Sequence, residues 1–204
     1  MNIFVFGTLL SETFRKIVLG RELNSEHICT ASLKNFCVYW AEAGPFPVIV
    51  PKDGTEVHGV VLKDLNEHDI ERLNYYELGF GYVLREALVE TNERLQDVFA
   101  YFCKSSDMAS KNLWSFDDWL TKHSEIQYRA TTEFMDFFGT KFGDTAQRMY
   151  NSILKRAEIY VKERSSVRKV IEGGPSKHAK GQVESLSREY LGFFALNQIN
   201  LKYP

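Results

Sequence analysis

Glu77 is the residue of this sequence best placed for acid–base chemistry. It stands in the segment Asn74-Tyr75-Tyr76-Glu77-Leu78-Gly79, at the end of a helix whose apolar stripe is predicted over residues 67–76. A carboxylate at a helix C-terminus opposes the helix dipole, and aromatic neighbours that bury it raise its pKa toward the range useful for proton transfer. The alternative from local context is an exposed glutamate in a surface loop.

A glycine turn, Phe6-Gly7-Thr8-Leu9, follows the first predicted strand at residues 2–6. Glycine lets the backbone bend sharply and brings bare N–H groups close to a ligand. With a helix beginning after Ser11, these groups would hold a carboxylate or a carbonyl oxygen. The alternative is an ordinary turn at the end of a strand, with no ligand.

The elements that must position these two segments are mostly strands. Short apolar or alternating runs bounded by Gly, Pro and Asn predict strands, and segments with helical spacing predict helices. In chain order they are a strand at 2–6, a helix at 12–19, a β-rich segment at 28–40, strands at 47–51 and 57–62, a helix at 67–76, and strands at 82–90 and 97–103. Many strands with few helices predict an α+β domain built on a small, closed or strongly curved mixed sheet.

The second half of the chain has a helical pattern. A polar stretch at 105–112 is interpreted as a linker, and helices are predicted at about 116–122, 126–138, 144–164 and 183–190. We therefore predict two domains, a barrel domain over residues 1–104 and a helical extension over residues 105–204. Trp119 is expected to pack the extension onto the barrel.

Charge is unevenly distributed along the 204 residues. Residues 1–140 hold 13 Lys/Arg and 21 Asp/Glu, a net charge of −8, whereas residues 141–204 hold 12 and 6, a net charge of +6. A basic C-terminal part can bind nucleic acid. Here the basic residues are dispersed among apolar ones, which favours a solvated helix face or docking on the acidic domain. Nucleic acid is therefore not an expected partner.

Cysteine, histidine and hydropathy patterns restrict the class of protein further. The three cysteines form no CxxC pair and the five histidines have no ligand spacing, so we expect neither a disulfide framework nor a metal site. No segment approaches the roughly 20 apolar residues of a membrane span, and the N-terminus lacks the cationic region of a signal peptide. These patterns predict a cytoplasmic protein without membrane association.

Five short motifs occur in a fixed order along residues 1–104. They are Gly7-Thr8-Leu9, Phe46-Pro47, Val57-x-Gly59, Leu73-x-x-Tyr76-Glu77 and Tyr82-x-x-Arg85. This ordered set resembles the γ-glutamylcyclotransferase-like superfamily, which includes AIG2-like proteins and γ-glutamylamine cyclotransferases. Residues 105–204 are similar to the helical extension of a bacterial subgroup. The resemblance implies a small mixed β-barrel with flanking helices, followed by an α-helical extension.

The resemblance also implies residue roles. In that superfamily a loop usually reading Tyr-Gly-Ser/Thr-Leu binds the substrate, and the matching positions are Phe6, Gly7, Thr8 and Leu9. A glutamate near the end of the inserted helix is the acid–base group and matches Glu77. Apart from the resemblance, Tyr82 is expected to line the substrate pocket, with a place in the barrel core as the alternative. Phe6 departs from the usual tyrosine, a loss that mostly backbone contacts to the ligand would tolerate.

The implied activity is that of a cyclotransferase, of transferase or lyase type, which releases 5-oxoproline from a γ-glutamyl compound without a cofactor or a metal. The expected partner is this small substrate, and the sequence leaves open whether the protein forms a homo-oligomer. The alternative is a non-catalytic module of the same fold that binds a small metabolite or contacts another protein.

Overall fold

The computed structural model describes residues 1–92 and 94–172. The strands are β1 (Ile3–Val5), β2 (Ile28–Ala41), β3 (Gly44–Leu62), β4 (Tyr82–Thr91), β5 (Leu95–Cys103) and β6 (Ala109–Leu113). The helices are α1 (Glu12–Leu19), α2 (Glu67–Gly79), α3 (Phe116–Lys122), α4 (Ser124–Met135) and α5 (Gly143–Glu172), with 3-10 turns η1 (Gly7–Leu10), η2 (Ser25–His27) and η3 (Ser106–Met108). Contacts divide the chain into two compact units, Met1–Ala157 and Glu158–Pro204.

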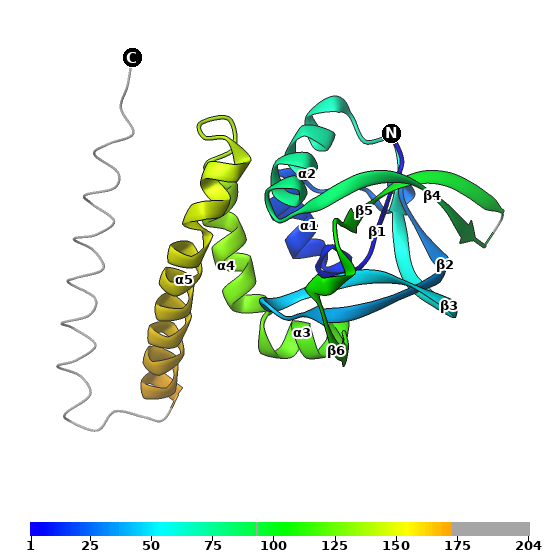
Figure 1. Ribbon diagram of the computed structural model, residues 1–204. Coiled ribbons are helices and arrows are strands. Elements are labelled where there is room, and N and C mark those ends of the chain that lie inside the picture. The colour runs from blue at the N-terminus through cyan, green and yellow to red at the C-terminus, as the bar shows by residue number, and fades with distance from the viewer. Residues whose placement is uncertain (93, 173–204) are drawn as a thin grey trace, which may run out of the picture. The chain divides into compact units, whose positions relative to one another are not determined.

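Five strands of the first unit close into a small mixed barrel (Figure 1). The strand order is β3–β1–β5–β4–β2, and the long antiparallel pairing of β2 with β3 closes the ring, while β6 pairs with β2. The sheet is mixed because β1 runs parallel to β5 and antiparallel to β3. The predicted class, an α+β fold with a small mixed barrel and flanking helices, is confirmed.

The sheet differs from the prediction in its third strand. Two separate strands were expected at 47–51 and 57–62, but β3 is continuous and pairs with β2 along most of its length. The register shifts after Lys34, where Asn35 has a φ of 62° and its side-chain oxygen accepts a hydrogen bond from the Gly54 N–H at 3.1 Å. This irregularity does not end the pairing, so Gly54, between the two predicted strands, lies inside one long strand.

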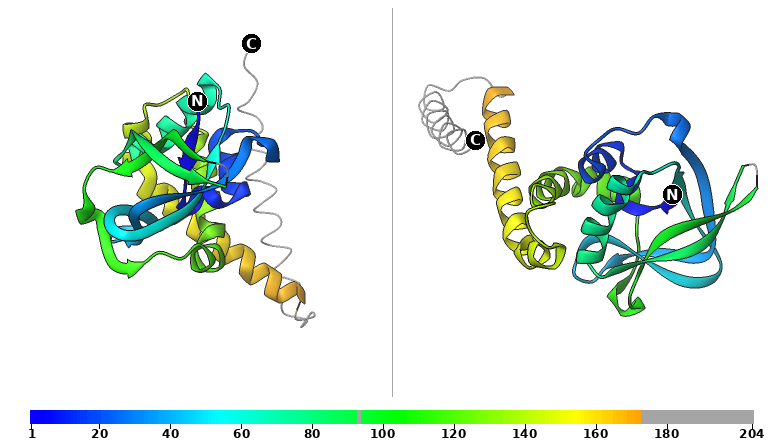
Figure 2. Two further views of the ribbon diagram at one scale, coloured as in Figure 1. Left: turned by 90° about the vertical axis from the view of Figure 1, so that its right-hand side faces the viewer. Right: turned by 90° about the horizontal axis from the view of Figure 1, so that it is seen from above.

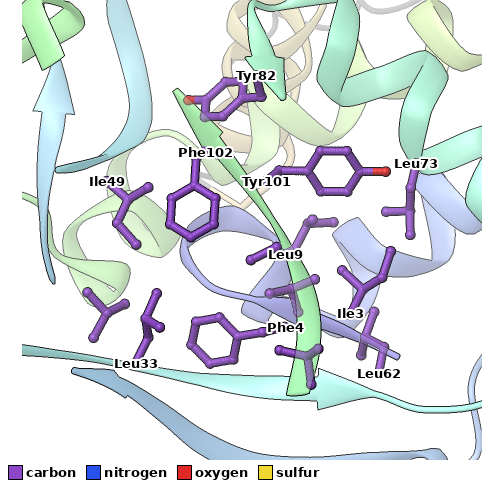
Figure 3. Packing of buried hydrophobic residues seen from close by; sticks show 14 of the residues in the cluster. Ile3, Phe4, Leu9, Leu33, Ile49, Leu62, Leu73, Tyr82, Tyr101 and Phe102 are labelled. Atoms are coloured by element: carbon purple, nitrogen blue, oxygen red, sulfur yellow. The ribbon is translucent and has the colours of Figure 1, made fainter. Parts of the chain in front are cut away.

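The barrel interior is filled by the apolar strand that precedes the glycine turn. Ile3, Phe4 and Val5 are all buried, and Phe4 packs toward the side of the barrel that holds Ile49 and Phe102 (Figure 3). A Cβ on Gly59 would lie 2.4 Å from the carbonyl oxygen of Val5 and 2.6 Å from the Phe4 ring. Only glycine lets β3 approach β1 this closely, so Gly59 helps to place the end of β1 where the chain turns.

Helices α1 and α2 contribute buried side chains to the core cluster of the barrel, and α4 packs against α1 (Figures 1 and 2). Ser11 begins α1 by accepting a hydrogen bond from the Phe14 N–H, and Gly20 ends it in the left-handed region, so α1 has the predicted bounds 12–19. Asn66 and Asp69 form a reciprocal capping box at the start of α2, which runs three residues further than the predicted stretch. These caps fix both helices that lead to the predicted site residues.

The compact barrel unit extends beyond residue 104, the predicted domain boundary. Residues 109–113, within and just after the expected linker, form strand β6 on β2 because their backbone completes sheet hydrogen bonds there. Trp119 is fully buried in the barrel's core cluster, in agreement with the expected packing. The helices predicted at about 116–122, 126–138 and 144–164 correspond to α3, α4 and α5. Residues 173–204 of the expected extension, with the helix predicted at 183–190, lie outside the described residues.

Residues 158–172 continue helix α5 in the second unit. In the described part of the chain, every helix is too short or too polar to cross a membrane.

Candidate active site

The glycine turn follows β1 in a conformation that only glycine tolerates. Gly7 has a φ of 65°, and a Cβ at this position would lie 2.3 Å from Cγ of Pro47. Both the backbone angle and the contact with β3 therefore require glycine. The turn continues as η1, whose first N–H groups have no partner within a 3-10 turn.

Arg15 holds the turn from helix α1. Its Nη1 donates hydrogen bonds to the carbonyl oxygens of Leu9 and Leu10, both at 2.8 Å. Burial lowers the pKa of this guanidinium, with Glu12 acting in the opposite direction, and the group remains a hydrogen-bond donor. Because the last carbonyls of the turn are tied to α1, the turn has a fixed position on the barrel rather than the freedom of a surface loop.

A cavity of about 50 Å³ brings most of the predicted site residues together. Its lining comes from β1 and the glycine turn, from the start of β3, from the end of α2, from β4 and β5, and from α4 and α5: Phe4, Val5, Phe6, Thr8, Leu9, Phe46, Pro47, Tyr76, Glu77, Phe80, Tyr82, Tyr101, Gln127 and Tyr150. Five of the six predicted residues are in this set. Gly7 does not line the cavity, but its backbone conformation gives the turn its shape.

Glu77 lies in the last turns of α2 and is buried, with 9% of its surface exposed. Its carboxylate makes no hydrogen bond or ion pair with any residue in the described ranges 1–92 and 94–172. Burial alone raises the pKa of this carboxyl from 4.5 to about 8, since the charged form is disfavoured away from water. The surface-loop alternative is therefore wrong, because Glu77 faces a cavity from a buried position.

Two tyrosine hydroxyls near Glu77 are already engaged. Tyr82 donates a 2.6 Å hydrogen bond to the Pro47 carbonyl oxygen, and Tyr101 donates a 2.8 Å hydrogen bond to Oδ1 of Asn74. Burial raises the pKa of both phenols, so both remain protonated donors at neutral pH. Tyr82 thus holds Pro47, which in turn packs against the glycine turn, while its ring forms part of the cavity wall.

Sequence reasoning did not identify the cavity wall supplied by helices α4 and α5. Gln127 and Tyr150 line the cavity, and the Tyr150 hydroxyl donates a 3.1 Å hydrogen bond to Oε1 of Gln127. Neither residue belongs to a local motif, and each has the helical spacing of a core position. Only the packing of the helices onto the end of α2 reveals their role.

Within the described residues, no three His, Cys, Asp or Glu side chains are grouped in a way that could hold a metal ion.

A family model described as "Gamma-glutamyl cyclotransferase, AIG2-like" matches residues 3–121, more than half of the sequence. The chain belongs to this family. The superfamily predicted from the ordered motifs is thereby confirmed, whereas the bacterial subgroup with a helical extension stays a prediction.

Individual relatives of this γ-glutamyl cyclotransferase, AIG2-like chain are distant. AIG2-like protein B of Arabidopsis thaliana is 27% identical over 140 residues, which cover 66% of this chain and 78% of the relative. A solution structure of another Arabidopsis thaliana protein has 24% identity and a TM-score of 0.47, covering 69% of this chain and 93% of the other. A solved structure titled "Gamma-glutamyl cyclotransferase" has 20% identity and a TM-score of 0.41, with coverage of 74% and 85%.

Proposed function

We propose that this chain is an enzyme that releases 5-oxoproline from a γ-glutamyl compound, with Glu77 as the acid–base group. The proposal is carried by the Glu77 carboxyl, which is buried without a partner among the described residues and lines the same cavity as Thr8 and Leu9 of the glycine turn. Membership of the γ-glutamyl cyclotransferase, AIG2-like family supports the choice of reaction.

The reaction is an intramolecular exchange of one amide for another. The α-amine nitrogen of the γ-glutamyl group attacks its own γ-carbonyl carbon and forms the new C–N bond of a five-membered ring. The bond from that carbon to the leaving amine breaks. One proton moves from the attacking nitrogen to the leaving nitrogen, so the products are 5-oxoproline and a free amine, and no water or oxidant is consumed. Ring closure has a high effective molarity, so positioning of the chain supplies much of the rate.

Glu77 is suited to move this proton. A free α-amine has a pKa of about 8, close to the value of about 8 for the Glu77 carboxyl, so the proton passes between them with little free-energy difference. A substrate ammonium group in the cavity lowers the carboxyl pKa and favours the ionised base. After ring closure the protonated carboxyl delivers the proton to the departing nitrogen.

We assign to the glycine turn the binding of the polar atoms of the γ-glutamyl group. Gly7, Thr8 and Leu9 present the unpaired N–H groups of a 3-10 turn, which suit the substrate α-carboxylate or the developing negative charge on the γ-carbonyl oxygen. Phe6 lines the cavity with an apolar ring in place of the usual tyrosine. In this account the hydroxyl that Phe6 lacks is not needed.

The test is 5-oxoproline release from γ-glutamyl dipeptides, γ-glutamylamines and glutathione by the wild type and Glu77→Gln. We expect turnover of at least one class, and a loss of roughly 10²–10⁴-fold in kcat/KM when the carboxyl becomes an amide. Glu71→Gln is the matched control, because Glu71 lies on the same helix with an exposed side chain.

Retained activity in Glu77→Gln contradicts the assigned mechanism. Tight binding of these compounds without turnover by the wild type contradicts the enzymatic proposal and favours the non-catalytic binding module.

A further inference from the structure

One wall of the cavity comes from residues beyond the part of the chain that matches the family model. The match ends at residue 121, whereas Gln127 of α4 and Tyr150 of α5 line the cavity. Both lie in the first compact unit, together with the barrel. The pocket of this chain is therefore completed by helices that are not part of the matched family region.

Gln127 is a buried polar side chain with an unused donor. Only 4% of its surface is exposed, and its Oε1 accepts the hydrogen bond from the Tyr150 hydroxyl. Its amide nitrogen has no hydrogen-bond partner within the described ranges. This nitrogen is not among the fully enclosed side-chain atoms that lack a partner, so it is accessible and free to donate to an acceptor on a ligand. The side chain thus offers two N–H groups to a molecule in the cavity.

The position of Gln127 is fixed from two sides. The Tyr150 ring packs edge-on against Phe80 of the α2 end, with a centroid distance of 4.7 Å. On α4, the hydroxyl of the neighbouring Tyr128 lies 2.8 Å from Oγ of Ser11, the residue that caps α1 directly after the glycine turn. Helix α4 is therefore tied to the turn, and the Gln127 amide has a defined direction, as a specificity residue requires.

The charge of the cavity restricts what the amide can bind. None of the described lining residues is Lys, Arg or His, and Glu77 is the one carboxylic acid among them. The glycine turn accounts for a single carboxylate, that of the γ-glutamyl group. A second carboxylate, on the leaving amine, would lose its hydration on entering the cavity. No cation there would stabilise its charge, and Glu77 would lie close to it. A neutral oxygen would gain the Gln127 donor instead.

We propose that Gln127, oriented by Tyr150, is a specificity-determining residue that hydrogen-bonds a neutral carbonyl oxygen on the leaving-amine half of the substrate. The pocket accordingly prefers γ-glutamyl compounds whose amine part is uncharged and carries such an oxygen over those whose amine part is a carboxylate. This inference rests on the proposed function, which places the γ-glutamyl half at the turn and Glu77 and leaves the wall of α4 and α5 for the other half.

The test uses three substrates of nearly equal size. The first two are γ-glutamylalaninamide, with a neutral carbonyl, and γ-glutamylalanine, with a carboxylate. The third is the γ-glutamyl derivative of 3-methylbutan-2-amine, in which two methyl groups replace the carboxamide oxygen and nitrogen. We expect wild-type kcat/KM to be highest for the alaninamide compound. Gln127→Leu should lower it about tenfold for that substrate and leave the 3-methylbutan-2-amine compound within about twofold.

A second variant separates recognition from folding. Gln127→Leu leaves the Tyr150 hydroxyl without its acceptor, whereas Gln127→Leu with Tyr150→Phe removes both polar partners, a change that is often nearly neutral for stability. The double variant should show the same loss, confined to the alaninamide compound. An equal loss on all three substrates in both variants, or a wild-type preference for γ-glutamylalanine, would overturn the inference.

A binding measurement keeps this test independent of turnover. Calorimetric Kd values for the same three compounds are measured in the Glu77→Gln background, with and without Gln127→Leu. Loss of an approximately tenfold preference for the alaninamide over the 3-methylbutan-2-amine compound supports the role of Gln127, and an unchanged preference refutes it. Absence of 5-oxoproline from every compound with the wild type would refute the proposed function alone.

Discussion

The two ends of helix α2 carry two buried carboxylates with opposite surroundings. Asp69, in the first turn, is 1% exposed and accepts hydrogen bonds from Nε and Nη2 of Arg21 at 2.7 and 2.6 Å and from the Asn66 N–H at 3.0 Å. Glu77, near the last turn, has no such partner in the described part of the chain. The Arg21 hydrogen bonds hold the pKa of Asp69 below its usual value, whereas burial raises that of Glu77 to about 8.

This difference separates a structural acid from a candidate catalytic one. The negative charge of Asp69 is stabilised by an arginine and by the positive end of the helix dipole, so ionisation of Asp69 favours the fold. At the other end the dipole disfavours an anion, and the fold gains nothing from ionised Glu77. A buried acid that does not stabilise the protein and that lines a cavity is a candidate for a role in ligand chemistry.

The largest expected difference between variants of Glu77 and Asp69 is in enzyme activity. Glu77→Gln should lower kcat/KM by roughly 10²–10⁴-fold, as argued above, while Asp69→Asn, assayed well below its melting temperature, should leave kcat/KM within about threefold. The reason is that Asp69 does not line the cavity. A comparable loss in both variants would break the distinction between the two ends of the helix.

The next contrast is in the pH dependence of stability. The Glu77 pKa is higher in the folded state than in the unfolded state, so the unfolded chain loses its proton first as pH rises. The free energy of unfolding should therefore fall between about pH 4.5 and pH 8, by at most about 1.4 kcal/mol per pH unit, and the fall should be absent in Glu77→Gln.

Asp69 should act with the opposite sign. Its folded pKa is lowered, so its contribution to stability is present above pH 3.8 and is lost as pH falls further. Urea unfolding of both variants across pH 3–9 measures the two contributions together. A wild-type stability that rises between pH 5 and pH 8 relative to Glu77→Gln would contradict the raised pKa.

The smallest contrast is the stability change at neutral pH. Asp69→Asn removes the charge-assisted pair with Arg21 and should lower the free energy of unfolding by about 1–3 kcal/mol. Glu67→Gln, an exposed change in the same helical turn, is its control and should stay within about 0.5 kcal/mol. Thermal and urea unfolding report both, and a neutral result for Asp69→Asn would mean that the pair with Arg21 does not stabilise the helix start.

Local signals predicted the parts of this fold that depend on neighbouring residues. Ser11 and Gly20 bound α1 and Asn66 begins α2 because caps act within one helical turn. Local signals failed for β3, where the Asn35 side chain keeps two predicted strands in one ladder. They also failed for β6, whose polar residues are a strand only because β2 offers them a partner.

The candidate site also contains residues that sequence patterns identified and residues that they did not. Gly7 and Glu77 could be singled out from sequence, because a glycine after a buried strand and an acid at a helix end have local physical meaning. Gln127 and Tyr150 could not, since their role depends on α4 and α5 packing against the end of α2. The pairing of Tyr82 with Pro47 was equally hidden, because 35 positions separate the two residues.

The central claim is that Glu77 holds its proton near neutral pH. It is tested most directly by carbon NMR titration of the glutamate side-chain carboxyls in the wild type, with Glu77→Gln identifying the resonance. In the wild type, one carboxyl should titrate with a midpoint near pH 8, and its resonance should be absent in the variant. A Glu77 midpoint near 4.5, like that of an exposed glutamate, would contradict this claim.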